Sequence, residues 1–97
     1  MSSLTIDIST DGNETEVVLI GDLDLATTGQ FLAAMEAATE HGRLAVTVDA
    51  RRLAFCDSVG LRALLSAPSP GPLAVRASEQ LERLLKMTET DQAFRLL

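Results

Sequence analysis

The sequence predicts an α/β fold in a single domain that spans residues 1–97. Segments with strand-like and helix-like patterns alternate along the chain, which is typical of βαβ crossovers and of a sheet covered by helices. Hydrophobic residues make up 46% of the chain, which is enough to pack a core. Domains commonly have about 100 to 150 residues. The chain therefore has room for one core, and any function must lie on its surface.

An N-terminal β-hairpin is expected first. Residues 4–8 alternate apolar and polar side chains, the period of a half-buried strand. Residues 11–13, Asp-Gly-Asn, supply turn chemistry, and residues 16–20 supply a second strand. Gly21 is expected to end that strand and to open an acidic loop over residues 22–25.

A helix, a buried strand and a second helix are expected next. Residues 26–41 carry apolar side chains at three- and four-residue spacing, and Gly42 is placed to end this helix in a left-handed conformation. Residues 44–48 are apolar and partly β-branched, as in a strand buried on both faces, and they predict the central strand. A short helix then begins near residues 57–58 and must end at Pro68.

The C-terminal part predicts one more strand and one more helix. Residues 66–72 contain all three prolines and indicate an irregular connection, and residues 73–76 form a short strand. Ser78 is placed as the N-cap of a helix that continues through Lys86. Residues 94–97 can add a last short element.

The charge distribution excludes some classes of partner. The net charge is -6, whereas nucleic acids and anionic membranes require a basic surface, so neither is expected as a partner. Residues 1–41 hold eight acidic residues and no Lys or Arg, and all eight basic residues lie from Arg43 onward. A protein that contacts the N-terminal half meets negative potential, although the same charges also serve as a solvated surface.

Membrane insertion and secretion are not expected either. No apolar run approaches the roughly 20 residues of a membrane span. The N-terminus lacks the basic start and the apolar block of a signal peptide. We therefore expect a cytoplasmic protein.

Catalytic and metal-binding residues are not expected. A hydrolytic triad would need Ser58, Asp57 and the only histidine, His41, but His41 is expected at the C-terminal end of a helix. Cys56, the only cysteine, cannot form an internal disulfide and is expected to pack as a small apolar side chain. The chain also lacks a phosphate-binding GxxxxGK[ST] loop and a GxSxG motif. We expect no enzyme activity, no metal and no cofactor.

Two groups of polar residues remain as candidates for a binding site. Asp57 and Ser58 lie between a strand and a helix, where either side chain can cap the helix and Gly60 permits close packing. A serine at a helix N-terminus is also a place where a phosphate is electrostatically favoured. Asp22 and Asp24 lie on one side of the backbone if that segment is extended, and otherwise serve as turn or capping residues.

Three segments together resemble the STAS domain of bacterial anti-sigma factor antagonists. They are residues 21–26 (GDLDLA), residues 46–49 (VTVD) and residues 55–61 (FCDSVGL), and residues 78–87 resemble the family's last helix. The resemblance covers nearly the whole chain. It implies a STAS-like mixed sheet of four or five strands with helices packed largely on one face.

The resemblance also implies a partner-switching function in transcription regulation and stress response. Members of the family bind an anti-sigma factor that is itself a serine kinase, and phosphorylation of the motif serine blocks this binding. On this chain the motif serine is Ser58, and the implied partners are an anti-sigma factor with serine kinase activity and, transiently, a serine phosphatase. The implied partner-binding residues are Asp22, Asp24, Asp57, Ser58, Val59 and Gly60.

An alternative function stays open. A STAS-like chain can also serve as an unphosphorylated scaffold subunit of a lipid-transport ATPase or of a stress-signalling assembly. Two segments depart from the usual family pattern: residues 66–72 are short and rich in proline, and residues 88–90, Thr-Glu-Thr, stand where the family commonly has a turn of Gly and Leu.

Overall fold

The computed structural model describes residues 2–39, 45–69 and 71–97. Its elements, in chain order, are β1 (Leu4–Asp11), β2 (Glu14–Leu23), α1 (Thr28–Thr39), β3 (Ala45–Cys56), α2 (Ser58–Ser66), β4 (Leu73–Ala77), α3 (Glu79–Met87), the 3-10 helix η1 (Asp91–Ala93) and β5 (Phe94–Leu96). His41 and Gly42, which were expected to end the first helix, lie outside the described residues. In the part of the chain that the structure describes, no helix has the length and apolar character needed to cross a membrane.

The five strands form one mixed sheet in the order β1-β2-β3-β4-β5. β1 pairs with β2 as an antiparallel hairpin, and each later pair of neighbours is parallel. The parallel pairs require crossovers, which α1, α2 and α3 supply in turn. The predicted α/β fold with a mixed sheet is confirmed, and β3, which contains residues 45–48 of the predicted central strand, is the middle strand.

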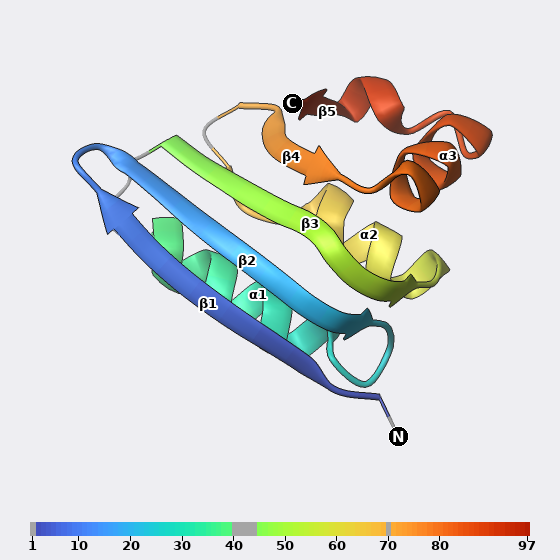
Figure 1. The fold of residues 1–97 in the computed structure, drawn as a ribbon, viewed down its shortest axis with the longest axis horizontal. Coiled ribbons are helices and arrows are strands. Elements are labelled where there is room, and N and C mark those ends of the chain that lie inside the picture. The colour runs from blue at the N-terminus through green and yellow to red at the C-terminus, as the bar shows by residue number, and fades with distance from the viewer. Residues whose placement is uncertain (1, 40–44, 70) are drawn as a thin grey trace.

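One face of the sheet is covered by helices. Figure 1 shows α1 and α2 behind the sheet, with α3 beside β4. The strands bury alternate side chains toward the helices, so that Val17 and Leu19 of β2 and Val48 of β3 are fully inaccessible to solvent. Phe31 of α1 and Leu85 of α3 belong to the same core. The side chains that alternate with the buried ones point to the open face.

Two strands are longer than the sequence predicts. The expectation that Gly21 ends the second strand is wrong, because β2 continues to Leu23 and stays paired with β3 as far as Cys56. Gly21 has a φ of 114°, and a Cβ atom there would lie 2.4 Å from the carbonyl oxygen of Ser3. Glycine therefore lets the strand pass close to the N-terminal segment, whose Ser3 carbonyl accepts a hydrogen bond from the Asp22 N–H at 2.9 Å.

The remaining helix ends follow local signals in the sequence. Ser78 caps α3 as predicted, because its Oγ accepts a hydrogen bond from the Leu81 N–H at 3.1 Å. α2 ends at Ser66, two residues before Pro68. Glu89, after the last turn of α3, adopts a left-handed φ of 57°, a conformation that favours glycine.

Candidate functional site

The candidate site lies where β2 and β3 end and α2 begins. β2 and β3 are parallel neighbours, and their last residues, Leu23 and Cys56, are register partners. Only Asp57 separates the end of β3 from Ser58, the first residue of α2. The N-terminal end of α2 is therefore held at the edge of the sheet. The first backbone N–H groups of a helix have no hydrogen-bond partners within the helix.

Asp57 caps α2. Its backbone is extended, with φ -95° and ψ -173°, and its Oδ1 accepts a hydrogen bond from the Gly60 N–H at 2.8 Å. The Asp57 carbonyl accepts the Leu61 N–H, also at 2.8 Å. Because Asp57 makes the cap, the Ser58 hydroxyl is left outside it. Ser58 is exposed at the first position of the helix, within reach of a partner.

Gly60 brings the two predicted segments into backbone contact. A Cβ atom at this position would lie 2.1 Å from the carbonyl oxygen of Leu23, far inside the contact distance. The same Leu23 carbonyl accepts a hydrogen bond from the Asp57 N–H at 3.4 Å. Only glycine permits this approach, so it places the acidic segment after β2 beside the start of α2.

The two carboxylates of that acidic segment have different surroundings. The Asp24 side chain is buried, and its Oδ1 accepts hydrogen bonds from the Ala26 N–H at 3.0 Å and from the Thr27 hydroxyl at 3.4 Å. The Ser2 hydroxyl donates to its other oxygen, and this hydrogen bond is the main cause of the lowered pKa of Asp24. Asp24 therefore acts as a turn residue that shapes the loop. Asp22, on β2, is half-buried and keeps access to solvent.

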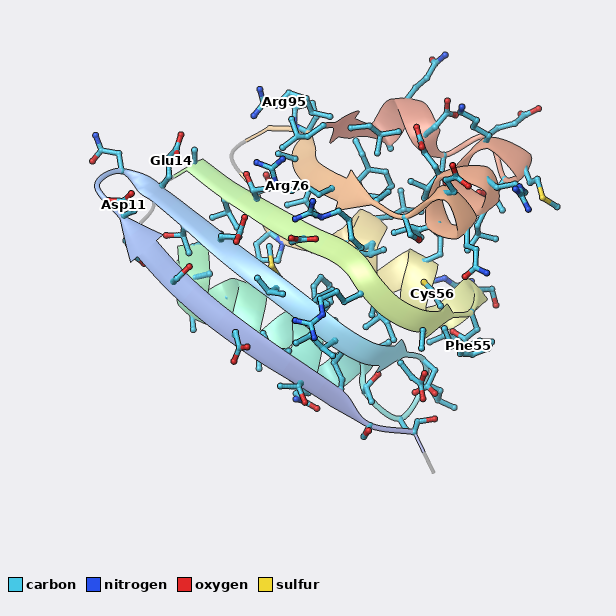
Figure 2. All side chains as sticks on the ribbon, in the orientation of Figure 1. Asp11, Glu14, Phe55, Cys56, Arg76 and Arg95 are labelled. Carbon is cyan, nitrogen blue, oxygen red and sulfur yellow. The ribbon has the colours of Figure 1, made fainter. Side chains whose placement is uncertain are left out.

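Two exposed apolar side chains lie at this edge and were absent from the predicted site. Leu25, next to Asp24, is 76% exposed, and Phe55, near the end of β3, is 53% exposed. Phe55 is the register partner of Asp22, and Figure 2 shows it beside the loop that follows β2. Large exposed apolar side chains gathered at one place indicate an interaction surface. In the sequence, Leu25 stands out only as an apolar residue inside an acidic loop. Periodicity alone does not distinguish such a residue from a core residue.

A shallow groove adjoins this edge. It has a volume of about 240 Å³ and lies between residues 53–56 of β3 and the start of α3, where Ser78 and Leu81 contribute to its wall. Phe55 and Cys56 line the groove and also stand next to the Asp57 cap. The edge therefore offers an apolar hollow within a few residues of Ser58.

The cysteine beside the site has the properties of a packing residue. Cys56 is half-buried against the core, and burial raises the pKa of its thiol to about 11, with a further contribution from the charge of Asp57. The thiol is therefore neutral near pH 7 and a poor nucleophile or metal ligand. Within residues 2–39, 45–69 and 71–97, no three His, Cys, Asp or Glu side chains gather in a way that could hold a metal ion.

The third motif segment lies away from Ser58. Residues 46–49 occupy the first half of β3, where Val46 and Val48 are core residues. Asp49 is buried on the other face of the strand, and its carboxylate forms an ion pair with Arg51 at 2.7 Å. This part of the motif therefore stabilises the central strand, whereas residues 21–26 and 55–61 meet at the candidate site.

Comparison with known proteins identifies the family. The family model described as Mlab, STAS domain, matches residues 6–97. The chain belongs to the STAS domain family. A comparison with curated proteins gave no match.

Solved structures share the STAS fold with this chain. An anti-sigma factor antagonist from Mycobacterium paratuberculosis is 23% identical and superimposes with a TM-score of 0.84, over 97% of this chain and 85% of its own. The anti-sigma factor antagonist SpoIIAA in its unphosphorylated form is 17% identical, with a TM-score of 0.68, over 96% of this chain and 88% of its own. The Bacillus cell fate determinant SpoIIAA in the phosphorylated form is also 17% identical, with a TM-score of 0.57, over 96% and 91%. At these identities the likeness concerns the fold.

The predicted partner-binding residues differ in their exposure to solvent. Of the six predicted partner-binding residues, Ser58 is exposed, and Asp22, Asp57 and Val59 are partly accessible. The other two, Asp24 and Gly60, are buried and set the shape of the two segments. Their contribution to any partner surface is therefore indirect.

Proposed function

We propose that this STAS domain is a cytoplasmic anti-sigma factor antagonist that is switched off by phosphorylation of Ser58. In its unmodified form it binds an anti-sigma factor with serine kinase activity, and the sigma factor held by that partner is released. The observation that carries the proposal is the exposed Ser58 at the first position of α2, beside the Asp57 cap. The shared fold with SpoIIAA, which has been solved in unphosphorylated and phosphorylated forms, supports it.

The surface around Ser58 suits a protein partner. Leu25 and Phe55 offer exposed apolar area, and the groove beside Phe55 can receive an apolar side chain. Asp22 and Asp57 supply negative charge that attracts a basic surface. Acidic side chains near exposed apolar ones fit a partner that has basic side chains near an apolar contact.

The local structure also suits Ser58 as a substrate. The kinase partner would bind ATP, and the Ser58 Oγ would attack the γ-phosphorus, with its proton passing to a base of the kinase and ADP leaving. The product phosphate would lie at the N-terminus of a nine-residue helix, where the dipole and the free N–H groups favour an anion. Arg62, four residues along α2 and exposed, is spaced to pair with that phosphate.

The added charge would act against the docked state. A phosphate contributes about -1.5 to -2 charges, next to the Asp57 carboxylate and close to the segment that carries Asp22. In solvent these charges are hydrated, but a docked partner would remove that water, and Arg62 alone would balance only part of the added charge. Conversion of a 99:1 bound population to 1:99 takes about 5.5 kcal/mol of differential affinity, which a desolvated interfacial charge can supply.

Binding to a purified anti-sigma factor kinase tests the proposal. Ser58→Ala should bind about as well as the wild type and should not be labelled by the kinase, and Ser58→Asp should bind more weakly. The matched control is Ser66→Asp, which adds the same charge to an exposed serine at the other end of α2 and should retain affinity. Equal affinities for Ser58→Asp and Ser58→Ala would contradict the charge mechanism.

The alternative is an unphosphorylated scaffold role on a transport ATPase or a stress-signalling assembly. Intact mass measurement of the protein from its host separates the two. A species heavier by one phosphate that disappears in Ser58→Ala supports the switch. An unmodified mass under all growth conditions favours the scaffold.

A further inference from the structure

The open face of the sheet has one acidic side and one basic side. Strand register places a row of acidic side chains on the open face of β1 and β2, and two arginines on the open face of β4 and β5. The acidic residues are Asp7, Asp11, Glu14 and Glu16, and the basic residues are Arg76 and Arg95. Figure 2 shows Arg76 and Arg95 over β4 and β5, and Asp11 and Glu14 at the hairpin turn on the opposite side.

The middle of this face is partly apolar and carries one net positive charge. On β3, the Asp49 carboxylate is paired with Arg51 at 2.7 Å. Arg52, the exposed register partner of Ile20, adds a positive charge to the same face. Val18 and Ile20 of β2 are half-buried on the same face and can lose further area to a partner. The only contact that links the two charged sides within the described chain is a 3.8 Å pair between Glu16 and Arg76. The face is therefore acidic on β1 and β2 and net basic from β3 to β5.

We infer that this face is a self-complementary surface through which two copies of the chain form a twofold dimer. A twofold axis that runs along β3 places β1 of one copy over β5 of the other, so the acidic side of each copy covers the basic side of its partner. Packed sheets lie about 10 Å apart with their strands nearly aligned. The inference is independent of the proposed function.

Register specifies the contact. Arg95 and Ser9 lie in the same row across the sheet. The register partners that connect them, from β4 to β2, are Ala74, Thr47 and Glu16. The twofold axis therefore sets Arg95 over Ser9 of the second copy, between Asp7 and Asp11. Both of these acids are exposed and open-facing. Each dimer contains this contact twice, which doubles the effect of any change to it.

The size of the face is sufficient for a dimer. Figure 1 looks down the shortest axis of the molecule, whose two longer extents, helices included, are 33 and 30 Å. Specific interfaces take about 800 Å² from each partner, which a face of these dimensions can supply. Ser58 starts a helix on the opposite, covered side, so a dimer of this kind leaves both copies of Ser58 accessible.

Sedimentation velocity of the full chain, up to millimolar concentration, tests the inference. The wild type should show a reversible dimer, and Arg95→Glu should weaken it by about tenfold because two attractive contacts become repulsive. Arg62→Glu, which makes the same charge change on α2 behind the sheet, is the matched control and should dimerise like the wild type. A wild type that stays monomeric throughout overturns the inference.

Mixing two variants gives a sharper test. Arg95→Glu alone and Asp7→Lys/Asp11→Lys alone should each dimerise poorly, because like charges then face each other. In their mixture, Glu at 95 faces Lys at 7 and 11, and the native contact is kept on the other side of the axis. Native mass spectrometry should therefore detect a heterodimer in preference to either homodimer. Dimers of all three kinds in statistical proportion, or an effect of Arg62→Glu equal to that of Arg95→Glu, would overturn the proposed geometry.

Discussion

Gly60→Ala should lower the stability of the domain by about 2 to 4 kcal/mol. The added Cβ atom would lie 2.1 Å from the Leu23 carbonyl oxygen, and relief of this overlap requires α2 to move about 1 Å away from the end of β2. Leu61 and Leu64, which α2 buries against the core, must move with it and lose part of their contacts. The expected loss of stability thus has two causes: overpacking at the Leu23 carbonyl oxygen and looser packing along one face of α2.

Urea unfolding followed by circular dichroism measures this loss, with Gly29→Ala as the matched control. Gly29 is exposed in α1 and a Cβ atom there meets nothing within 4 Å, so the same substitution should stabilise the protein by up to about 1 kcal/mol through helix propensity. For a domain of this size the melting temperature of Gly60→Ala should fall by roughly 10 to 25 °C. A loss below about 0.5 kcal/mol, as for an ordinary surface substitution, would refute the argument that contact between β2 and α2 requires glycine.

Three further outcomes follow from other parts of the structure. Glu89→Gly should raise the unfolding free energy by about 1 kcal/mol, because Glu89 holds a left-handed φ of 57°; unchanged stability in urea would show that the turn is not strained. Asp49 has a pKa held below its ordinary value of 3.8, chiefly by its hydrogen bond with Arg51, so its stabilising contribution is complete above that value and is lost as the pH falls through the lowered pKa. Acid titration of stability should therefore be flatter in Asp49→Asn, and identical slopes below pH 4 would contradict this. Cys56, with a pKa of about 11, should be alkylated at pH 8 on the order of a hundredfold more slowly than free cysteine, and an equal rate would show that the thiol is not desolvated.

Local patterns predicted most elements of the fold. The alternation in β1, the apolar spacing of α3 and the Ser78 cap depend on neighbouring residues and appear in the structure as predicted. The ends of β2 and β3 were not predictable in this way. Gly21 is a residue typical of turns, but the strand continues through it. β3 pairs with β2 on one side, and on the other side the Ser3 carbonyl accepts a hydrogen bond from the Asp22 N–H. Long-range pairing thus overrode local preference.

In the candidate site, too, local features were predictable and long-range contacts were not. The Asp57-Ser58 pair at a helix start was predictable, since capping is a local property, although the sequence left open which of the two residues makes the cap. The contact of Gly60 with Leu23 depends on a packing arrangement between distant segments. The exposure of Leu25 and Phe55 has the same origin, because only the assembled sheet edge leaves these apolar side chains without cover.

The choice of Asp57 as the cap has a consequence for a switch at Ser58. If the serine hydroxyl made the cap, a phosphate on it would replace a hydrogen bond that stabilises the helix by about 1 kcal/mol, and modification would alter folding together with binding. Because Asp57 already accepts the Gly60 N–H, a charge on Ser58 leaves that bond in place and gains from the helix dipole. Ser58→Asp should therefore keep the melting temperature of the wild type or raise it slightly, even where it weakens a partner's binding. A marked loss of thermal stability would mean that affinity and folding are coupled at this helix start, and that the modified protein acts through partial unfolding instead of through charge at an intact surface.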